Sequence, residues 1–154
     1  MLTALPNEGY RGEAPEFPLP RRMVFRWEFE DKKRFQVFDA EATDLVVDRE
    51  RELWERIWSY PQAAAWAVEP WRWNTVAMYV RTFVVCESSE ATAADKGSLH
   101  RFADQIGLTP AGLKENGWAV AADQVSKKAA TKATGAPASS ARDRMKVVSG
   151  GDGA

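Results

Sequence analysis

Hydrophobic residues recur at two spacings along the chain, first at every second position and later at every third or fourth. Between Met23 and Phe38, aromatic and aliphatic residues alternate with polar ones on both sides of a polar turn. Alternation of this kind is typical of β-strands. We therefore expect a β-hairpin at 23–38, with strands at about 23–29 and 34–38. An isolated hairpin is marginally stable in water, so it has to pack on helices or extend a neighbour's sheet.

From residue 43 the hydrophobic spacing becomes that of a helix. Thr43 or Asp44 is a suitable N-cap, and apolar residues then fall on one face. Pro61 interrupts this helix, because the residue before a proline is driven out of the helical region. A short alanine-rich helix is expected at 62–68, and Pro70 starts a second long helix. Two long amphipathic helices joined at such a corner predict a helical hairpin.

Two shorter helices are expected after a polar joint at 88–97. The first should end at Gly107, the residue type favoured just beyond a helix C-terminus. Thr109 is a suitable cap and Pro110 a suitable first residue for the second helix, which we expect to run on through Trp118. These elements predict a mainly α fold: a helical-hairpin core with a small N-terminal β-hairpin, a short C-terminal helix pair and a disordered tail.

Composition divides the chain into three parts. Residues 1–22 contain four prolines and two glycines, which predicts an irregular Pro-rich arm. Residues 23–125 are expected to form the helical domain. Residues 126–154 offer too few large apolar groups to offset the entropy of ordering them, which predicts a disordered basic tail.

The net charge of −1 argues against a globally basic nucleic-acid binder, but the charges are segregated. Residues 41–95 carry five basic and ten acidic side chains, whereas residues 121–154 carry six basic and three acidic ones. An acidic middle and a basic tail suggest different partners. We find no signal-peptide pattern and no apolar run long enough to cross a membrane, and we expect a cytoplasmic protein.

Candidate catalytic residues are few. Cys86 is the single cysteine and His100 the single histidine, so neither a disulfide framework nor a metal-ligand cluster is expected. We expect Cys86 to be buried in its helix and His100 to be a surface residue. Glu50, Glu52 and Glu55 share a helix with several arginines and are interpreted as a solvated, salt-bridged face. The sequence predicts a protein that is not an enzyme and that needs no cofactor or metal.

The tryptophans are concentrated, since five of the seven lie between Trp54 and Trp73. We interpret Trp54 and Trp58 as residues on the buried face of the first long helix. Large aromatics that remain once a small core is filled indicate a subunit interface. The predicted oligomer interface of the helical hairpin comprises Trp54, Trp58, Trp66, Trp71, Trp73 and Val80.

Two sequence stretches resemble a known family. They are LWERIW-x-x-PQA-x-x-W at Leu53–Trp66 and GLTPAGL at Gly107–Leu113. The chain from about residue 15 to 120 resembles the small terminase subunits of tailed bacteriophages, particularly those of actinobacterial phages and prophages. The resemblance implies a homo-oligomeric ring of roughly eight to ten copies. Such a ring recognises viral double-stranded DNA in the host cytoplasm and presents it to the large terminase subunit, which holds the ATPase and nuclease, for genome packaging.

Many members of that family have an N-terminal helix-turn-helix, whereas this chain has strand and loop there. The position of the DNA therefore has to be sought among its basic groups, with the hairpin turn and the preceding arginines first and the C-terminal helix pair second. The DNA-binding candidates are Arg21, Arg22, Lys32, Lys33, Arg34, Arg101 and Lys114. The partner-binding candidates in the tail are Lys127, Lys128, Lys132, Arg142, Arg144 and Lys146.

Two other functions fit parts of the sequence. Residues 101–118 could form the helix-turn-helix of a transcriptional regulator, with Lys114 and Asn116 facing the major groove. The chain could also be a virion adaptor protein without a role in DNA binding.

Overall fold

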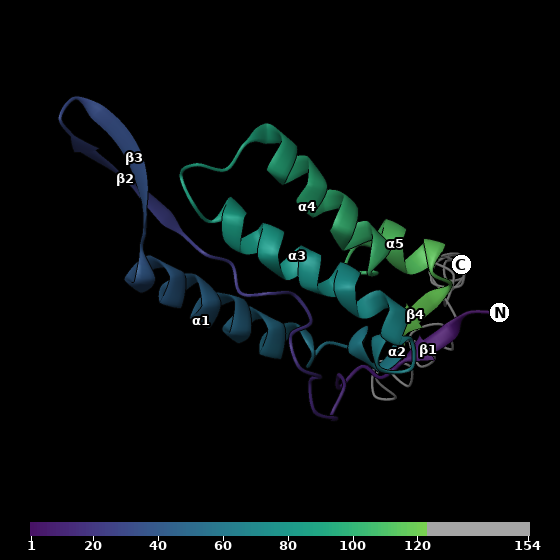
Figure 1. Cartoon of the computed structure of the whole chain (residues 1–154). Helices are drawn as coiled ribbons and strands as arrows, with labels where there is room; N and C mark the ends of the chain where they lie inside the picture. The colour runs from purple at the N-terminus through teal and green to yellow at the C-terminus, as the bar shows by residue number, and fades with distance from the viewer. Residues whose placement is uncertain (123–154) are drawn as a thin grey trace, which may run out of the picture. The chain divides into compact units, whose positions relative to one another are not determined.

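Three long helices form the body of the protein (Figure 1). The structure, a computed structural model, describes residues 1–122 of the chain. Helix α1 (Ala40–Ile57) packs on α3 (Trp73–Cys86), and α3 in turn packs on α4 (Ala93–Gln105). About half of the described residues are helical, and they are accompanied by two small two-stranded sheets, which is consistent with the predicted fold class at that coarse level.

The corner between α1 and α3 has the predicted form. The chain leaves α1 at Trp58, turns through Pro61, and forms the short helix α2 (Ala63–Ala67). A 3-10 helix, η1 (Pro70–Arg72), then leads directly into α3. The prolines stand where each helix is broken or begun, because the ring excludes the preceding residue from the helical region and is tolerated in a first turn.

Helix α1 begins at Ala40, four residues before the start that a cap at Thr43 predicts. Asp39 is the N-cap, and its carboxylate accepts a hydrogen bond from the Ala42 amide at 2.9 Å. Both predicted caps, Thr43 and Asp44, lie inside the helix, and Thr43 is fully buried there. Its hydroxyl donates to the Asp39 carbonyl and accepts from the Val24 amide, so it ties the helix to the chain that enters the hairpin.

The predicted polar joint at 88–97 is too long, because α4 already starts at Ala93. Thr92 and Asp95 form a capping box, in which each side chain accepts a hydrogen bond from the other residue's amide. The helix predicted to continue through Trp118 ends earlier. Helix α5 (Pro110–Glu115) has Thr109 as its cap, as predicted, and stops before Gly117, whose φ of +69° is favourable for glycine.

A parallel pair of strands that the sequence did not reveal joins the two ends of the described chain. Strand β1 (Thr3–Leu5) pairs with β4 (Trp118–Val120), in register from Thr3 opposite Trp118 to Leu5 opposite Val120. The beginning of the predicted irregular arm is therefore a strand. Leu5 is buried in the core, and residues 1–121 form one compact unit.

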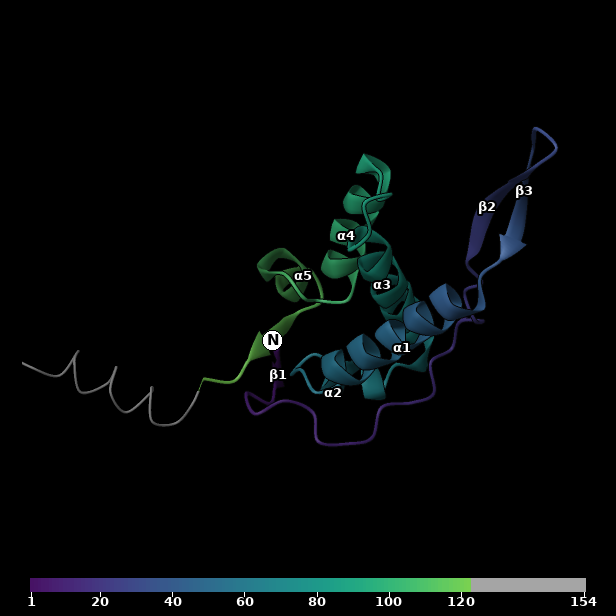
Figure 2. The same cartoon turned by 90° about the vertical axis from the view of Figure 1, so that its left-hand side faces the viewer.

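The predicted β-hairpin is present. Strand β2 (Phe25–Glu30) pairs antiparallel with β3 (Lys33–Phe38) through a two-residue turn at Asp31 and Lys32, which have φ angles of 47° and 61°. Positive φ at both turn residues matches the right-handed twist of the strands. The hairpin extends beyond the first turn of α1 and packs extensively on none of the described helices (Figures 1 and 2).

Most of the tryptophans fill the core. Trp58 lies at the centre, with ring centroids of Trp54, Trp66 and Trp73 between 5.5 and 6.0 Å away. Tyr10 from the arm packs edge-on against the same ring. The buried apolar residues are Leu5, Leu53, Trp54, Ile57, Trp58, Ala63, Ala65, Trp66, Val76, Ala77, Val80, Val84, Ile106 and Trp118.

This core corrects the predicted oligomer interface. Four of its members are no more than 2% exposed and so cannot lie on the surface of the folded chain: Trp54, Trp58, Trp66 and Val80. Trp73 is half-buried against the same cluster. Of the predicted set only Trp71 projects into solvent, with 69% of its surface exposed.

The predicted solvated face of α1 is also corrected at one position. Glu52 is exposed and pairs with Arg49 and Arg56, as expected. Glu50, in contrast, is 3% exposed, and Arg81 of α3 binds both its carboxylate oxygens at 2.9 and 3.0 Å. A buried carboxylate needs such a partner, and this pair connects the two long helices.

Candidate functional site

The hairpin separates its side chains into two different faces. Because neighbouring residues of a strand point to opposite sides, the pairing register assigns every position to a face. One face carries no acidic residue and consists of Phe25, Trp27, Phe29, Arg34, Gln36 and Phe38. The opposite face carries Arg26, Glu28, Glu30, Lys33, Phe35 and Val37. We call the first set the aromatic face of the hairpin.

The aromatic face is open to solvent. Phe25 and Trp27 are about half exposed, Phe29 is 75% exposed, and Phe38 is 40% exposed. The Arg34 guanidinium lies 3.5 Å from the centroid of the Trp27 ring, a cation–π contact. Exposed aromatics grouped with an arginine are typical of surfaces that bind a partner.

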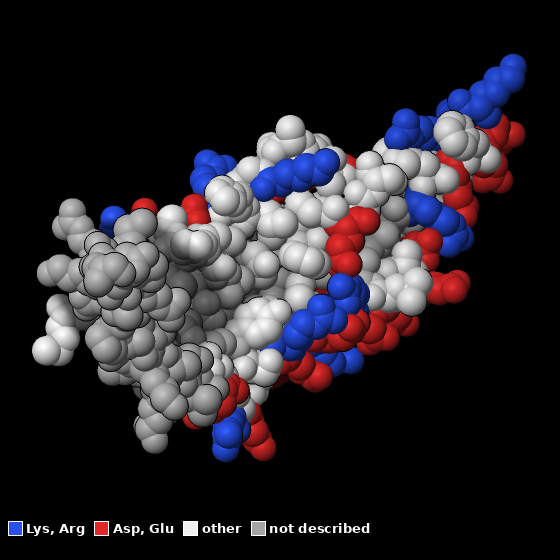
Figure 3. Space-filling model, turned by 180° about the vertical axis from the view of Figure 1, so that it is seen from behind, with Lys and Arg blue, Asp and Glu red and all other residues white. Residues whose placement is uncertain are grey.

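The tip of the hairpin holds two adjacent cations of the predicted DNA-binding set. Lys32 and Lys33 are exposed and form no ion pair with any residue in 1–122. Figure 3 shows basic side chains projecting from this end of the unit. Arg26 is less available, because Glu28 pairs with it at 2.8 Å and raises its pKa.

The arginines that precede the hairpin are partly engaged within the chain. Arg21 pairs with Asp44 of α1, and Arg22 is half-buried. Arg101 lies on α4 and its guanidinium contacts the Ser98 hydroxyl at 3.4 Å. Lys114 is exposed on α5. The structure therefore distributes the predicted DNA-binding residues over three places, of which only the hairpin turn presents adjacent unpaired cations.

The predicted helix-turn-helix is a close-packed helix pair, and one of its two expected base contacts is engaged within the chain. A Cβ on Gly112 would lie 2.3 Å from the Asp104 carbonyl oxygen, so α5 rests directly on the end of α4. The Asn116 amide, one of two expected groove contacts, donates to the carbonyls of Gln105 and Gly112. It serves to end α5 and is not free to read a base.

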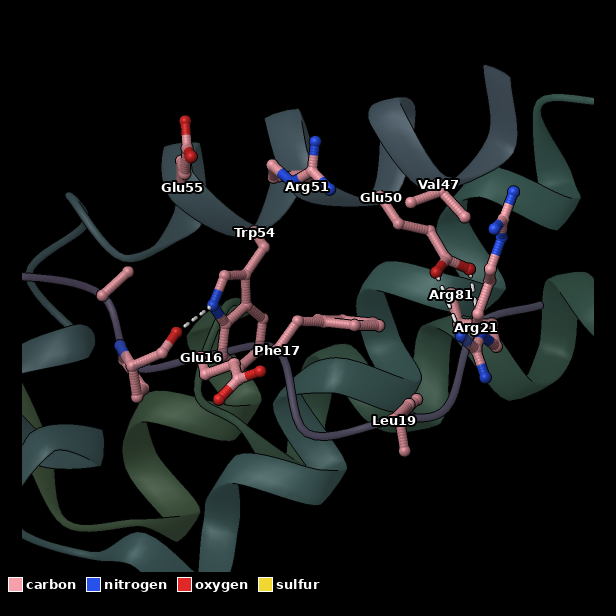
Figure 4. Close-up of a pocket in the computed structure, with 12 residues that line it drawn as sticks. Glu16, Phe17, Leu19, Arg21, Val47, Glu50, Arg51, Trp54, Glu55 and Arg81 are labelled. Atoms are coloured by element: carbon pink, nitrogen blue, oxygen red, sulfur yellow. Dashed lines mark hydrogen bonds and ion pairs between the residues drawn. The ribbon is translucent and has the colours of Figure 1, made fainter. Parts of the chain in front are cut away.

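A groove of about 500 Å³ lies where the arm crosses α1 and α3 (Figure 4). The Trp54 indole donates to the Pro15 carbonyl at 2.7 Å, and Phe17 packs edge-on against the same indole. Arg81, held by Glu50, donates to the Pro20 carbonyl at 2.6 Å. These contacts hold the arm in an extended course over the helices, and residues of the arm between 14 and 21 line one side of the groove.

Residues 1–122 hold the chain's single histidine and single cysteine. No group of three His, Cys, Asp or Glu side chains there could hold a metal ion. His100 is exposed on α4, as expected, with Asp104 3.8 Å away. Cys86 is half-buried at the end of α3, more open than predicted. No helix in the described range is long and apolar enough to cross a membrane.

Sequence reasoning found the basic turn but overlooked the aromatic face. Trp27 alternates with Phe25 and Phe29 in the sequence, but it lies apart from the tryptophan-rich stretch after residue 53 and is not among the predicted interface residues. The predicted tail residues, from Lys127 to Lys146, lie outside the described range.

Comparison of the chain with protein-family models, curated proteins and solved structures finds no match.

Proposed function

We propose that this protein is a small terminase subunit of a tailed phage: a non-catalytic, ring-forming protein that recognises viral DNA and presents it to the large terminase subunit. The observation that supports this most directly is the projecting hairpin, whose turn offers Lys32 and Lys33 without ion-pair partners among residues 1–122. Cations of this kind can neutralise DNA phosphates and release counterions.

Ring symmetry would supply the avidity for DNA that a single subunit lacks. One turn with two lysines and a net chain charge of −1 give weak DNA binding by a monomer. A ring repeats the turn in every copy, so that several turns engage one duplex and the avidity rises steeply. In this proposal the basic tail binds the large subunit, and packaging takes place in the host cytoplasm.

Filter binding over a series of salt concentrations tests the DNA contact. The variant Lys32→Asn/Lys33→Thr removes both turn cations while keeping residue types suited to the turn and the strand. We expect weaker retention of double-stranded DNA and a log–log salt slope lower by about 0.9 for each phosphate that the variant no longer neutralises.

A comparison variant, Lys96→Gln/Lys114→Gln, removes the same charge from exposed positions on α4 and α5, and its Lys114 belongs to the second group of DNA-binding candidates. It should retain DNA like the unsubstituted chain. Loss of binding in this comparison variant, with none in the hairpin variant, would transfer the DNA site to the C-terminal helix pair and favour a transcriptional regulator. If neither pair changes the salt slope, the adaptor function is favoured. A monomer by light scattering at micromolar concentration would contradict the ring.

A further inference from the structure

The aromatic face of the hairpin has no partner within the described chain. Its four aromatic residues are between 40% and 75% exposed, and no described helix packs extensively on them. Two-stranded hairpins are marginally stable alone, and burying the open face of one would stabilise it. All the acidic side chains of β2 and β3 lie on the opposite face, so desolvating the aromatic face would bury no carboxylate from these strands.

A second exposed apolar surface lies beyond the other end of α1. Val68, just after α2, is 79% exposed, and Trp71 in η1 is 69% exposed. We call these two residues the Trp71 corner. A groove of about 450 Å³ adjoins Trp71 and is lined in part by Thr75, Gln105 and Glu115. Glu115 forms no ion pair with any residue in 1–122.

The two surfaces are unlike and far apart. The hairpin joins the first turn of α1, whereas α2 follows its last turn, and 18 helical residues span about 27 Å. Figure 1 shows the hairpin and the α2 corner at opposite ends of the helical body. Different surfaces at opposite ends favour head-to-tail contact between copies, in which one surface meets the other and each copy uses both.

We infer that the aromatic face of one copy docks on the Trp71 corner of the next copy of this chain. Phe29 and Trp27 would cover Trp71 and Val68, and Arg34 is placed on the aromatic face to approach the unpaired carboxylate of Glu115. Repetition of this heterologous contact closes a ring when the rotation between copies is a whole fraction of a turn. The inference rests on the ring in the proposed function and assigns its interface.

A mixing experiment with the full chain tests the contact. One variant, Trp27→Thr/Phe29→Thr, loses the aromatic face but keeps β-forming residues. The other, Val68→Thr/Trp71→Gln, loses the corner. Each variant alone should sediment as a monomer in analytical ultracentrifugation. An equimolar mixture at high concentration should form a 1:1 heterodimer, because one intact aromatic face then meets one intact corner.

A control variant, Leu45→Gln/Met78→Gln, removes two exposed apolar residues from α1 and α3 and should assemble like the unsubstituted chain. Thermal unfolding verifies that each variant is folded, and the single changes Phe29→Thr and Trp71→Gln replace any double variant that is not. If either surface variant assembles normally, or if the mixture stays monomeric, the contact is wrong.

The same samples separate this inference from the proposed function. An unsubstituted chain that forms a ring and retains DNA, while the surface variants also form rings, overturns only the proposed contact. An unsubstituted chain that is a monomer overturns both the contact and the ring.

Discussion

The buried indoles serve as hydrogen-bond donors as well as core residues. Trp54 donates to the Pro15 carbonyl, Trp66 to the Ile106 carbonyl at 3.0 Å, and Trp73 to the Trp66 carbonyl at 2.8 Å. Two of these carbonyls lie outside helices, in the arm and at the end of α4. The indoles therefore attach irregular backbone to the helical core, which phenylalanine or leucine could not do.

Trp58 differs from its neighbours, since its indole N–H has no hydrogen-bond partner in the described chain. We expect Trp58→Phe to cost less stability than Trp66→Phe. Both changes shrink a buried ring, but only the second leaves a buried carbonyl, that of Ile106, without its donor, at a cost of about 1–3 kcal/mol. Urea unfolding of the two variants measures the difference, and an equal or larger loss in Trp58→Phe would contradict it.

The hydrogen bonds of the indoles could not be predicted from the sequence. Helical spacing correctly assigned Trp54 and Trp58 to a buried face, because the period of an amphipathic helix is a local property. The indole donors bind backbone carbonyls of the arm and of the turn after α4. The path of these segments is set by tertiary structure, so a local sequence pattern does not reveal which carbonyls need a donor. Trp66 was consequently assigned to an interface, although its ring is fully buried.

At the scale of elements, most of those with local signals were predicted, apart from the caps at Asp39 and Thr92, and those without such signals were missed. The hairpin, the proline corner and the Thr109 cap each have their cause within a few residues. Strands β1 and β4 have three residues each and meet across more than a hundred positions of sequence, so alternation could not reveal them. At the candidate site, the basic turn follows from the local sequence and was predicted. The exposure of the aromatic face depends on tertiary packing, because no described helix covers it, and local sequence does not contain that information.

The capping box of α4 makes that helix sensitive to acid. Hydrogen bonds from the Thr92 amide and hydroxyl lower the pKa of Asp95. A carboxylate with a lowered folded-state pKa stabilises the fold above its unfolded-state pKa, near 4, and loses that contribution as the pH falls through the folded value.

We therefore expect Asp95→Asn to be less stable than the unsubstituted chain at neutral pH. The difference in unfolding free energy should shrink below about pH 4, where Asp95 itself becomes protonated. Urea unfolding of both proteins at several pH values measures it. A difference that is independent of pH down to about pH 2 would exclude the carboxylate as the cause.

At the scale of the molecule, the arm completes the fold. Gly9 has a φ of +86° and lies against the end of α1, where an added Cβ would stand 2.0 Å from the Ser59 carbonyl oxygen. The arm can follow the core this closely only with glycine at that position. Residues 23–122 without the arm would lack Leu5, Tyr10 and Phe17 from their packing.

We expect Gly9→Ala to destabilise the whole unit by about 1–3 kcal/mol, since both the clash and the positive φ oppose the change. The matched control is Gly97→Ala within α4, where an added Cβ meets nothing within 4 Å. This control should gain up to about 1 kcal/mol from helix propensity. Thermal unfolding compares the two, and a Gly9→Ala protein as stable as the unsubstituted chain would contradict the need for glycine at this position.

The parallel pairing of β1 with β4 also determines how the unit responds to tension. Because the two strands run in the same direction, a pull that separates Met1 from Ala121 draws one strand backward and the other forward. The ladder, together with the flanking bonds from Thr3 to Gly117 and from Ala121 to Leu5, is then loaded in shear, with its bonds sharing the force. A load applied at these two points would therefore meet a joint that resists sliding and does not open one bond at a time.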